Sequence, residues 1–343
     1  MQGQTGSSDS IYRDDVQMVS KQFFISGVIG TALLGAVGHA GAAQLNVVAS
    51  FSIIEDLVRN VGADRVTVKS IVPANGDAHT YEPRPADVIA LKRADLVLVN
   101  GLQFDPFMQR LAKSSDTKAP VVEVSKGIRP LKNTEDEHAH GDEHQDHDHD
   151  HGHGHDEPEG HHDHHHGEYD PHAWQSVPNA IIYVKNIAEA LCAADKGGCE
   201  TYKTNASDYT TKLKALDVSV REAIAALPAD KRTIITSHDA FGYLGATYGL
   251  TLLAPEGTSS ESEATAADVA AIIRQVRADK SAAIFMENIS NPALIKQISA
   301  ESGVAVGGKL YSDALSGPDE PASTYLKMMQ YNVDTITKAI LKK

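Results

Sequence analysis

The sequence predicts an α/β protein with two Rossmann-like lobes, each built on a parallel sheet, joined by one long rigid helix. Three observations support this class. Short apolar strand patterns alternate with helical patterns in residues 44–125, the same alternation returns in residues 232–310, and a long, mostly polar helical pattern at residues 200–227 separates the two. Short apolar strands separated by helices are typical of parallel sheets that are covered on both faces.

The first alternation predicts the N-terminal lobe. We expect its strands at residues 44–50, 66–72, 95–101 and 120–125, and its helices at residues 52–62, 84–94 and 105–114. A further helix at residues 177–194, with Pro178 in its first turn, is expected to complete this lobe.

The second alternation predicts the C-terminal lobe and ends in a terminal helix. We expect strands at residues 232–237, 250–254, 282–287 and 304–310, and helices at residues 240–248, 264–278, 291–302 and 323–343. The resulting plan is an N-terminal extension and signal peptide (1–43), an N-terminal lobe (44–132), a disordered His/Asp-rich loop (133–171), a helix completing the first lobe (172–198), a linking helix (199–228) and a C-terminal lobe (229–343).

The N-terminal residues have the pattern of a secretory signal. Lys21 precedes an apolar run at residues 23–37, small residues follow, and cleavage is expected just before Gln44. The apolar run is interrupted by glycines and is short for the alternative, a membrane-spanning helix. The residues before Met18 are polar, so Met18 is an alternative start to Met1. Because no cysteine near the cleavage site offers a point for lipid attachment, we expect a soluble periplasmic protein.

The net charge of -15 comes almost entirely from one segment. Fourteen of the 46 Asp and Glu residues lie in residues 133–171, where there is no Lys or Arg, so the rest of the chain has 32 acidic against 31 basic residues. A nearly neutral body has no basic excess to meet phosphates, which argues against nucleic acid as a partner.

The same segment holds 13 of the 17 histidines. It has almost no apolar side chain to offset the entropy cost of ordering, so we expect a disordered loop. Imidazoles and carboxylates in any local arrangement chelate weakly, and we therefore expect an auxiliary collector or sensor of zinc, the alternative being a solvated loop without a role in transport. The histidines assigned to this weak binding are His147, His149, His151, His153, His155, His161, His162, His164, His165 and His166.

The only two cysteines, Cys192 and Cys199, are separated by a short stretch that contains two glycines. An exported chain meets oxidising conditions, so a disulfide is expected. Free thiols or metal ligands are the alternatives, but two thiols without nearby histidines make a poor zinc site.

Three of the remaining histidines and one acid occupy comparable places along the chain. His79, His238 and Asp313 each follow a predicted strand, and His172 lies between the lobes just before a predicted helix. Ligands of open α/β sheets bind beyond the carboxyl ends of the strands, so these side chains are expected to converge on a cleft between the lobes. Three imidazoles and one carboxylate make a four-coordinate set of the kind that zinc prefers.

The segments around these residues resemble a known family. GDAHTYEPRPADV, DPHAW, SHDAFGYLGATYGL and GGKLYSDALS stand where the periplasmic solute-binding proteins of zinc and manganese ABC importers carry their four ligand segments. The resemblance covers essentially the whole mature chain, with the His-rich insert in its usual place. It implies a metal in the interlobe cleft, held by His79, His172, His238 and Asp313.

The third ligand position bears on the choice of metal. Manganese members of the family often carry a carboxylate there, whereas this sequence has His238, and an imidazole favours borderline over hard cations. Zn2+ is therefore expected, with manganese or iron as the alternative. Glu82, Asp239 and Glu287 are candidates for orienting the imidazoles, with surface or capping roles equally open.

Together these features predict high-affinity capture of zinc in the periplasm and delivery to the permease and ATPase of an ABC importer. We expect a monomer, and a periplasmic zinc metallochaperone is a further candidate partner. No enzyme is expected, because a fourth protein ligand closes the zinc shell and the chain has no HExxH or GxSxG motif. A pure metal buffer would leave the four ligand segments unexplained, and a metal-binding surface adhesin fits poorly with the expected absence of a lipid anchor.

Overall fold

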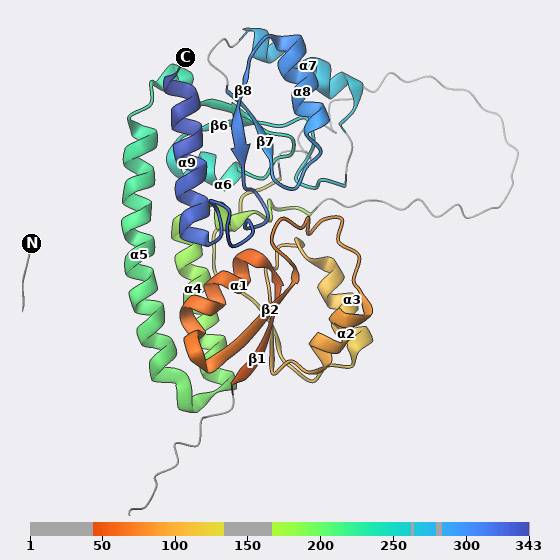
Figure 1. The fold of residues 1–343 in the computed structure, drawn as a ribbon, viewed down its shortest axis with the longest axis vertical. Coiled ribbons are helices and arrows are strands. Elements are labelled where there is room, and N and C mark those ends of the chain that lie inside the picture. Colours follow the sequence, from red (N-terminus) through yellow and green to blue (C-terminus); the bar gives the residue numbers. More distant parts are fainter. Residues whose placement is uncertain (1–43, 134–166, 262–263, 279–282, 343) are drawn as a thin grey trace, which may run out of the picture. The chain divides into compact units, whose positions relative to one another are not determined.

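A computed structural model of the chain describes residues 44–133, 167–261, 264–278 and 283–342, which belong to one compact unit (Figure 1). The expected signal peptide and the ten auxiliary histidines lie outside the described residues. In the part of the chain that is described, no helix is both long and apolar enough to cross a membrane.

The N-terminal lobe contains a four-stranded parallel sheet with the strand order β2-β1-β3-β4. Its strands are β1 (Leu45–Phe51), β2 (Val66–Val72), β3 (Leu96–Val99) and β4 (Val121–Glu123). Its helices are α1 (Ser52–Gly62), α2 (Pro85–Lys92), α3 (Pro106–Ser115) and α4 (Val177–Ala194). In Figure 1, α1 and α4 lie on one side of this sheet and α2 and α3 on the other. Coverage on both faces explains why all four residues of β3 are buried and apolar.

The C-terminal lobe has a second four-stranded parallel sheet, with the order β6-β5-β7-β8. Its strands are β5 (Thr233–Ile235), β6 (Thr251–Leu253), β7 (Ala283–Glu287) and β8 (Val306–Leu310). Its helices are α6 (Gly242–Tyr248), α7 (Ala266–Ala278), α8 (Pro292–Ser302) and α9 (Tyr325–Leu341). The prediction of two α/β lobes with parallel sheets is therefore confirmed.

The long helix α5 (Cys199–Ala225) has 27 residues and packs against α1, α4 and α9. Its buried side chains recur every three to four residues and so form one apolar stripe along an otherwise polar helix; they are Tyr202, Ala206, Tyr209, Leu213, Leu216, Val220 and Ile224. At its start, a disulfide joins Cys192 of α4 to Cys199 and closes the tight turn between the two helices.

Candidate metal centre

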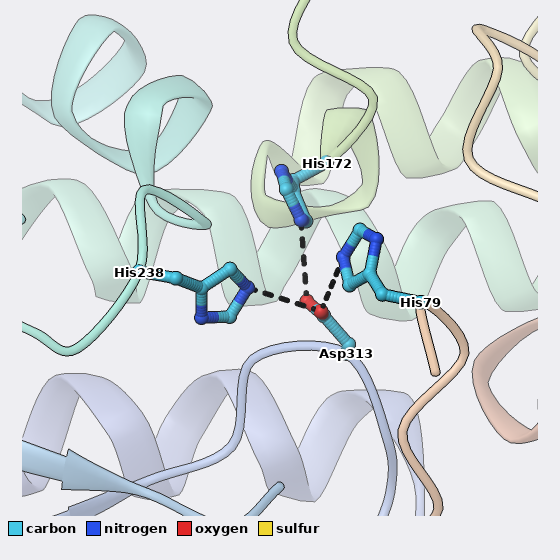
Figure 2. A group of neighbouring side chains, drawn as sticks. All are labelled: His79, His172, His238 and Asp313. Carbon is cyan, nitrogen blue, oxygen red and sulfur yellow. Dashed lines mark hydrogen bonds and ion pairs between the residues drawn. The ribbon is translucent and has the colours of Figure 1, made fainter. Parts of the chain in front are cut away.

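The loops at the ends of three strands and the segment before α4 bring four side chains together (Figure 2). His79 lies between β2 and α2, His238 follows β5, and Asp313 follows β8. His172 immediately precedes the short 3-10 helix η3 (Ala173–Gln175). One possible ligand atom from each residue lies within 4.8 Å of the other three. The four residues singled out in the sequence thus form one group.

Asp313 occupies the middle of this group. Its Oδ2 is 3.1 Å from Nε2 of His79 and 3.1 Å from Nε2 of His238, and its Oδ1 is 3.5 Å from Nε2 of His172. In a tetrahedral zinc site with metal–ligand distances of about 2.0–2.1 Å, neighbouring ligand atoms lie about 3.4 Å apart. The spacing around Asp313 therefore suits donors that share one ion.

The donor atoms are enclosed and in part unsatisfied. The side chains of His172, His238 and Asp313 are fully buried, and that of His79 is 7% exposed. Among the described residues, Nε2 of His79, Nε2 of His172 and Oδ1 of Asp313 are buried atoms that form no hydrogen bond, although they lie within 3.5 Å of one another's groups. Such atoms are rare because each costs the desolvation free energy of its group. A cation at the centre of the group would satisfy all three, so the residues present fit a bound metal.

Carboxylates hold two of the imidazoles from the side that faces away from the centre. Oδ1 of Asp170 lies 2.8 Å from Nδ1 of His172, and Oε2 of Glu287 lies 2.8 Å from Nδ1 of His238. A carboxylate at Nδ1 places the proton there and leaves Nε2 as the free donor atom, which fixes the tautomer a metal needs. Of the three orienting acids considered from the sequence, Glu287 has this position, whereas Glu82 is exposed on the surface.

The role of Asp170 beside His172 was not predicted from the sequence, although the sequence contains a signal for it. Oδ1 of Asp170 also accepts a hydrogen bond from the backbone N–H of His172 at 2.8 Å, and Oδ1 of Asp77 accepts one from the backbone N–H of His79 at 2.9 Å. Both are turns in which an Asp bonds to the backbone two residues later. The repeated Asp-x-His spacing in GDAH and YDPH could have identified both acids.

Aromatic rings form an apolar wall on one side of the group. The ring of Phe104 lies 5.0 Å from that of His79 and 5.8 Å from that of His172, and Trp174 lies 5.3 Å from His172. Phe104 and Trp174 are themselves buried. Exclusion of water on this side strengthens the electrostatic interactions between the imidazoles and the carboxylates.

The buried carboxylates also set the charge of the imidazoles. Burial lowers the pKa of His172, but Asp313 and Asp170 outweigh burial and raise this pKa to about 9. Burial also lowers the pKa of His238. Glu287 and Asp313 outweigh burial and raise this pKa well above its ordinary value. Burial acts to raise the pKa of Asp313, but His172 and His238 bring it well below its ordinary value. A cation that enters this site must therefore displace protons from the imidazoles.

Comparison with known proteins shows extensive similarity. The family described as zinc-uptake complex component A, periplasmic, matches residues 47–339. The chain is 33% identical to the iron-binding protein YfeA of Yersinia pestis, over 91% of this chain and 92% of that protein. It is 31% identical to the manganese-binding lipoprotein MntA of Halalkalibacterium halodurans, over 86% of this chain and 88% of that protein.

Solved structures agree with this similarity. The periplasmic zinc binding protein TroA of Treponema pallidum superposes with a TM-score of 0.75 at 29% identity, covering 87% of this chain and 99% of that chain. A Mn-bound mutant of the periplasmic metal binding protein of Candidatus Liberibacter asiaticus superposes with a TM-score of 0.73 at 31% identity, covering 87% of this chain and 100% of that chain.

Proposed function

The chain belongs to the family of the periplasmic component A of zinc-uptake complexes, whose relatives are metal-binding substrate-binding proteins of ABC transporters, and we propose that it captures zinc and hands it to an importer. Membership confirms the resemblance seen in the sequence. In this family the chain is a transport component and the metal is its cargo. The proposed ligands are His79, His172, His238 and Asp313.

The donor set is the observation that carries the choice of zinc. Three imidazole nitrogens surround one carboxylate, and imidazole-rich tetrahedral sites suit Zn2+ better than the hard cations that prefer oxygen. Glu287 and Asp170 support this choice because each lies at Nδ1 of its imidazole, which leaves Nε2 as the atom that gives up its proton to an incoming ion.

Manganese or iron is the alternative cargo. Both oxygens of Asp313 face imidazole nitrogens, so a bidentate carboxylate would raise the coordination number to five and bring a second oxygen to the ion. Relatives named for iron and for manganese show that related chains serve these metals.

Uptake measurements separate the two cargoes better than affinity does, because zinc binds more tightly than manganese to almost any site of this kind. We expect deletion of the gene in its native host to reduce accumulation of radioactive zinc in zinc-poor medium, with manganese accumulation unchanged. A loss of manganese or iron uptake with normal zinc uptake would assign the alternative cargo.

The remaining parts of the proposal concern location and partners. The signal pattern ending at Ala43 supports export to the periplasm, and the relatives include both a periplasmic protein and lipoproteins. We propose a soluble periplasmic monomer that docks on a permease with its ATPase, and a zinc metallochaperone is its candidate donor. The His-rich insert would act as an auxiliary collector of zinc.

A further inference from the structure

The enclosed centre poses the question of how an ion enters and leaves. The side chains of the four proposed ligands are between 0% and 7% exposed, so no ion can pass without movement of a neighbouring segment. Among the described residues, the connection between β6 and α7 contacts the loops that carry His238 and His79 directly, and it reaches the segment before His172 through Asn133. We refer to its residues 256–260 as the clasp.

The first contact of the clasp is with the loop that carries His238. The backbone N–H of Glu256 donates to the carbonyl of Ser237 at 3.1 Å, and the N–H of Asp239 donates to the carbonyl of Gly257 at 3.0 Å. These two bonds flank His238 and form a short parallel bridge between His238 and Glu256. The clasp therefore follows the His238 loop as a continuous backbone pairing.

The second contact reaches the segment that leads to His172. Oγ1 of Thr258 accepts a hydrogen bond from Nδ2 of Asn133 at 2.9 Å. The backbone N–H of Asn133 in turn donates to the carbonyl of Glu168 at 3.0 Å, two residues before Asp170. A buried side-chain hydrogen bond thus connects the clasp to Asn133, which is paired through its backbone with the segment just before His172.

The third contact reaches His79 through one carboxylate. Oγ of Ser260 donates to Oδ2 of Asp77 at 2.6 Å, while Oδ1 of the same carboxylate accepts the backbone N–H of His79 at 2.9 Å. Ser260 and Asp77 are 183 positions apart and belong to different lobes. Both side chains are half-buried, so this link lies where water can reach it.

The loop that carries Asp313 is held differently. Nε1 of Trp174 and Nε2 of Gln175 both donate to the carbonyl of Ser312, at 2.9 and 2.7 Å, and these groups are buried. The backbone N–H of Asn75 donates to the carbonyl of Leu315 at 2.8 Å. Buried and backbone bonds of this kind make the Asp313 side of the centre more costly to open than the half-buried hydroxyl link at Ser260.

We propose that the clasp closes the metal centre and that the Ser260–Asp77 hydrogen bond sets the rate at which the bound cation leaves. Asp77 and Ser260 act as positioning residues: they hold the His79 loop against the His238 loop without touching the ion. This proposal rests on the proposed function, because it requires that a metal binds at the four residues. Beyond that function, it names the segment and the two residues that control release of the ion.

The test compares release of Zn2+ from the full mature chain and from Ser260→Ala, measured by stopped-flow transfer to a chromogenic chelator. A hydrogen bond to a charged group is lost in the variant, so we expect the dissociation rate to rise about tenfold with an association rate within about a factor of two. Ser260→Thr keeps the hydroxyl and should restore the slow rate. Ser259→Ala is the matched control, because the hydroxyl of Ser259 bonds locally to the N–H of Glu261 at 3.3 Å.

Each outcome bears on a different claim. An unchanged dissociation rate in Ser260→Ala, or an equal increase in Ser259→Ala, overturns the clasp. A lower melting temperature of metal-free Ser260→Ala with unaltered release identifies a merely structural bond and overturns it as well. Absence of tight zinc binding by the unmodified chain contradicts the proposed function instead.

Discussion

At the scale of single residues, the centre depends on carboxylates that do not face the ion. Glu287 is fully buried; its Oε1 accepts the backbone N–H groups of Ser237 and His238 at 2.9 and 3.1 Å, and its Oε2 faces Nδ1 of His238. His238 lowers the pKa of Glu287 below its ordinary value, although burial acts to raise it. The ionised carboxylate is thus coupled to both the position and the tautomer of one proposed ligand.

We expect Glu287→Gln to weaken zinc binding by about 10- to 100-fold, because the amide keeps the shape of the side chain but loses the charge that orients the imidazole. Isothermal titration with a competing chelator measures the change. Glu82→Gln removes an exposed acid of the same type and should leave the affinity unaltered. Equal affinities for Glu287→Gln and the unmodified chain would reduce Glu287 to a packing role.

The protonation of His172 predicts how zinc affinity depends on pH. Because the pKa of His172 is raised to about 9, its imidazole carries a proton at neutral pH and loses it as the pH rises through that value. Zinc requires the neutral form, so the apparent affinity should rise by about tenfold per pH unit for each proton displaced, and the rise should become less steep once the pH passes the pKa of His172 at about 9. Titrations in two buffers with different ionisation enthalpies count the released protons. Affinity that is flat between about pH 6.5 and about pH 8.5 would contradict a histidine-rich site.

Some residues of the centre could be predicted from the sequence and others could not. His79, His238 and Asp313 were identifiable because each follows an apolar strand, and parallel strands of a sheet present their carboxyl ends at one edge. Asp77 and Asp170 were not predicted, although they share the Asp-x-His spacing, because Asp bonds to the backbone in many turns that have no part in a site. The contacts of Ser260 and Thr258 could not be predicted, since they join loops that are far apart in the chain.

At the scale of elements, the predicted helices and strands match the structure except at their ends. The strand expected at residues 232–237 is shorter, as β5 ends at Ile235. Ser237 instead turns its N–H and hydroxyl to Glu287, which redirects the chain so that His238 reaches the centre. A local apolar pattern cannot show this, because the competing partner lies on β7.

The turn between α4 and α5 allows a test of the disulfide. The bond between Cys192 and Cys199 closes a loop with a sequence separation of 7 residues. In the chain-entropy account a loop this short stabilises the fold by about 2 kcal/mol, so replacing both cysteines by serine should lower the free energy of unfolding by about that amount. Urea unfolding measures it. The zinc affinity should stay the same, and a large loss of affinity would show that this turn affects the centre.

At the scale of the whole molecule, one chain combines the candidate metal centre with a His-rich segment for which we propose weak zinc binding. The ends of the His-rich insert are paired, since Lys132 and Tyr169 form an antiparallel bridge and Tyr169 lies three residues before His172. The insert therefore starts and ends beside the centre, where weakly held ions would raise the local concentration of zinc. The four proposed ligands of the cargo site come from other segments of the chain.

Isothermal titration of zinc into a variant that lacks residues 135–166 tests this division most directly. The deletion keeps Asn133 and Glu168, whose backbone bond holds the two ends together. We expect one tightly bound Zn2+ per chain with the affinity of the unmodified protein, and loss of that site when His238→Ala is added. Disappearance of tight binding on deletion of the insert alone would contradict the assignment of the cargo site to His79, His172, His238 and Asp313.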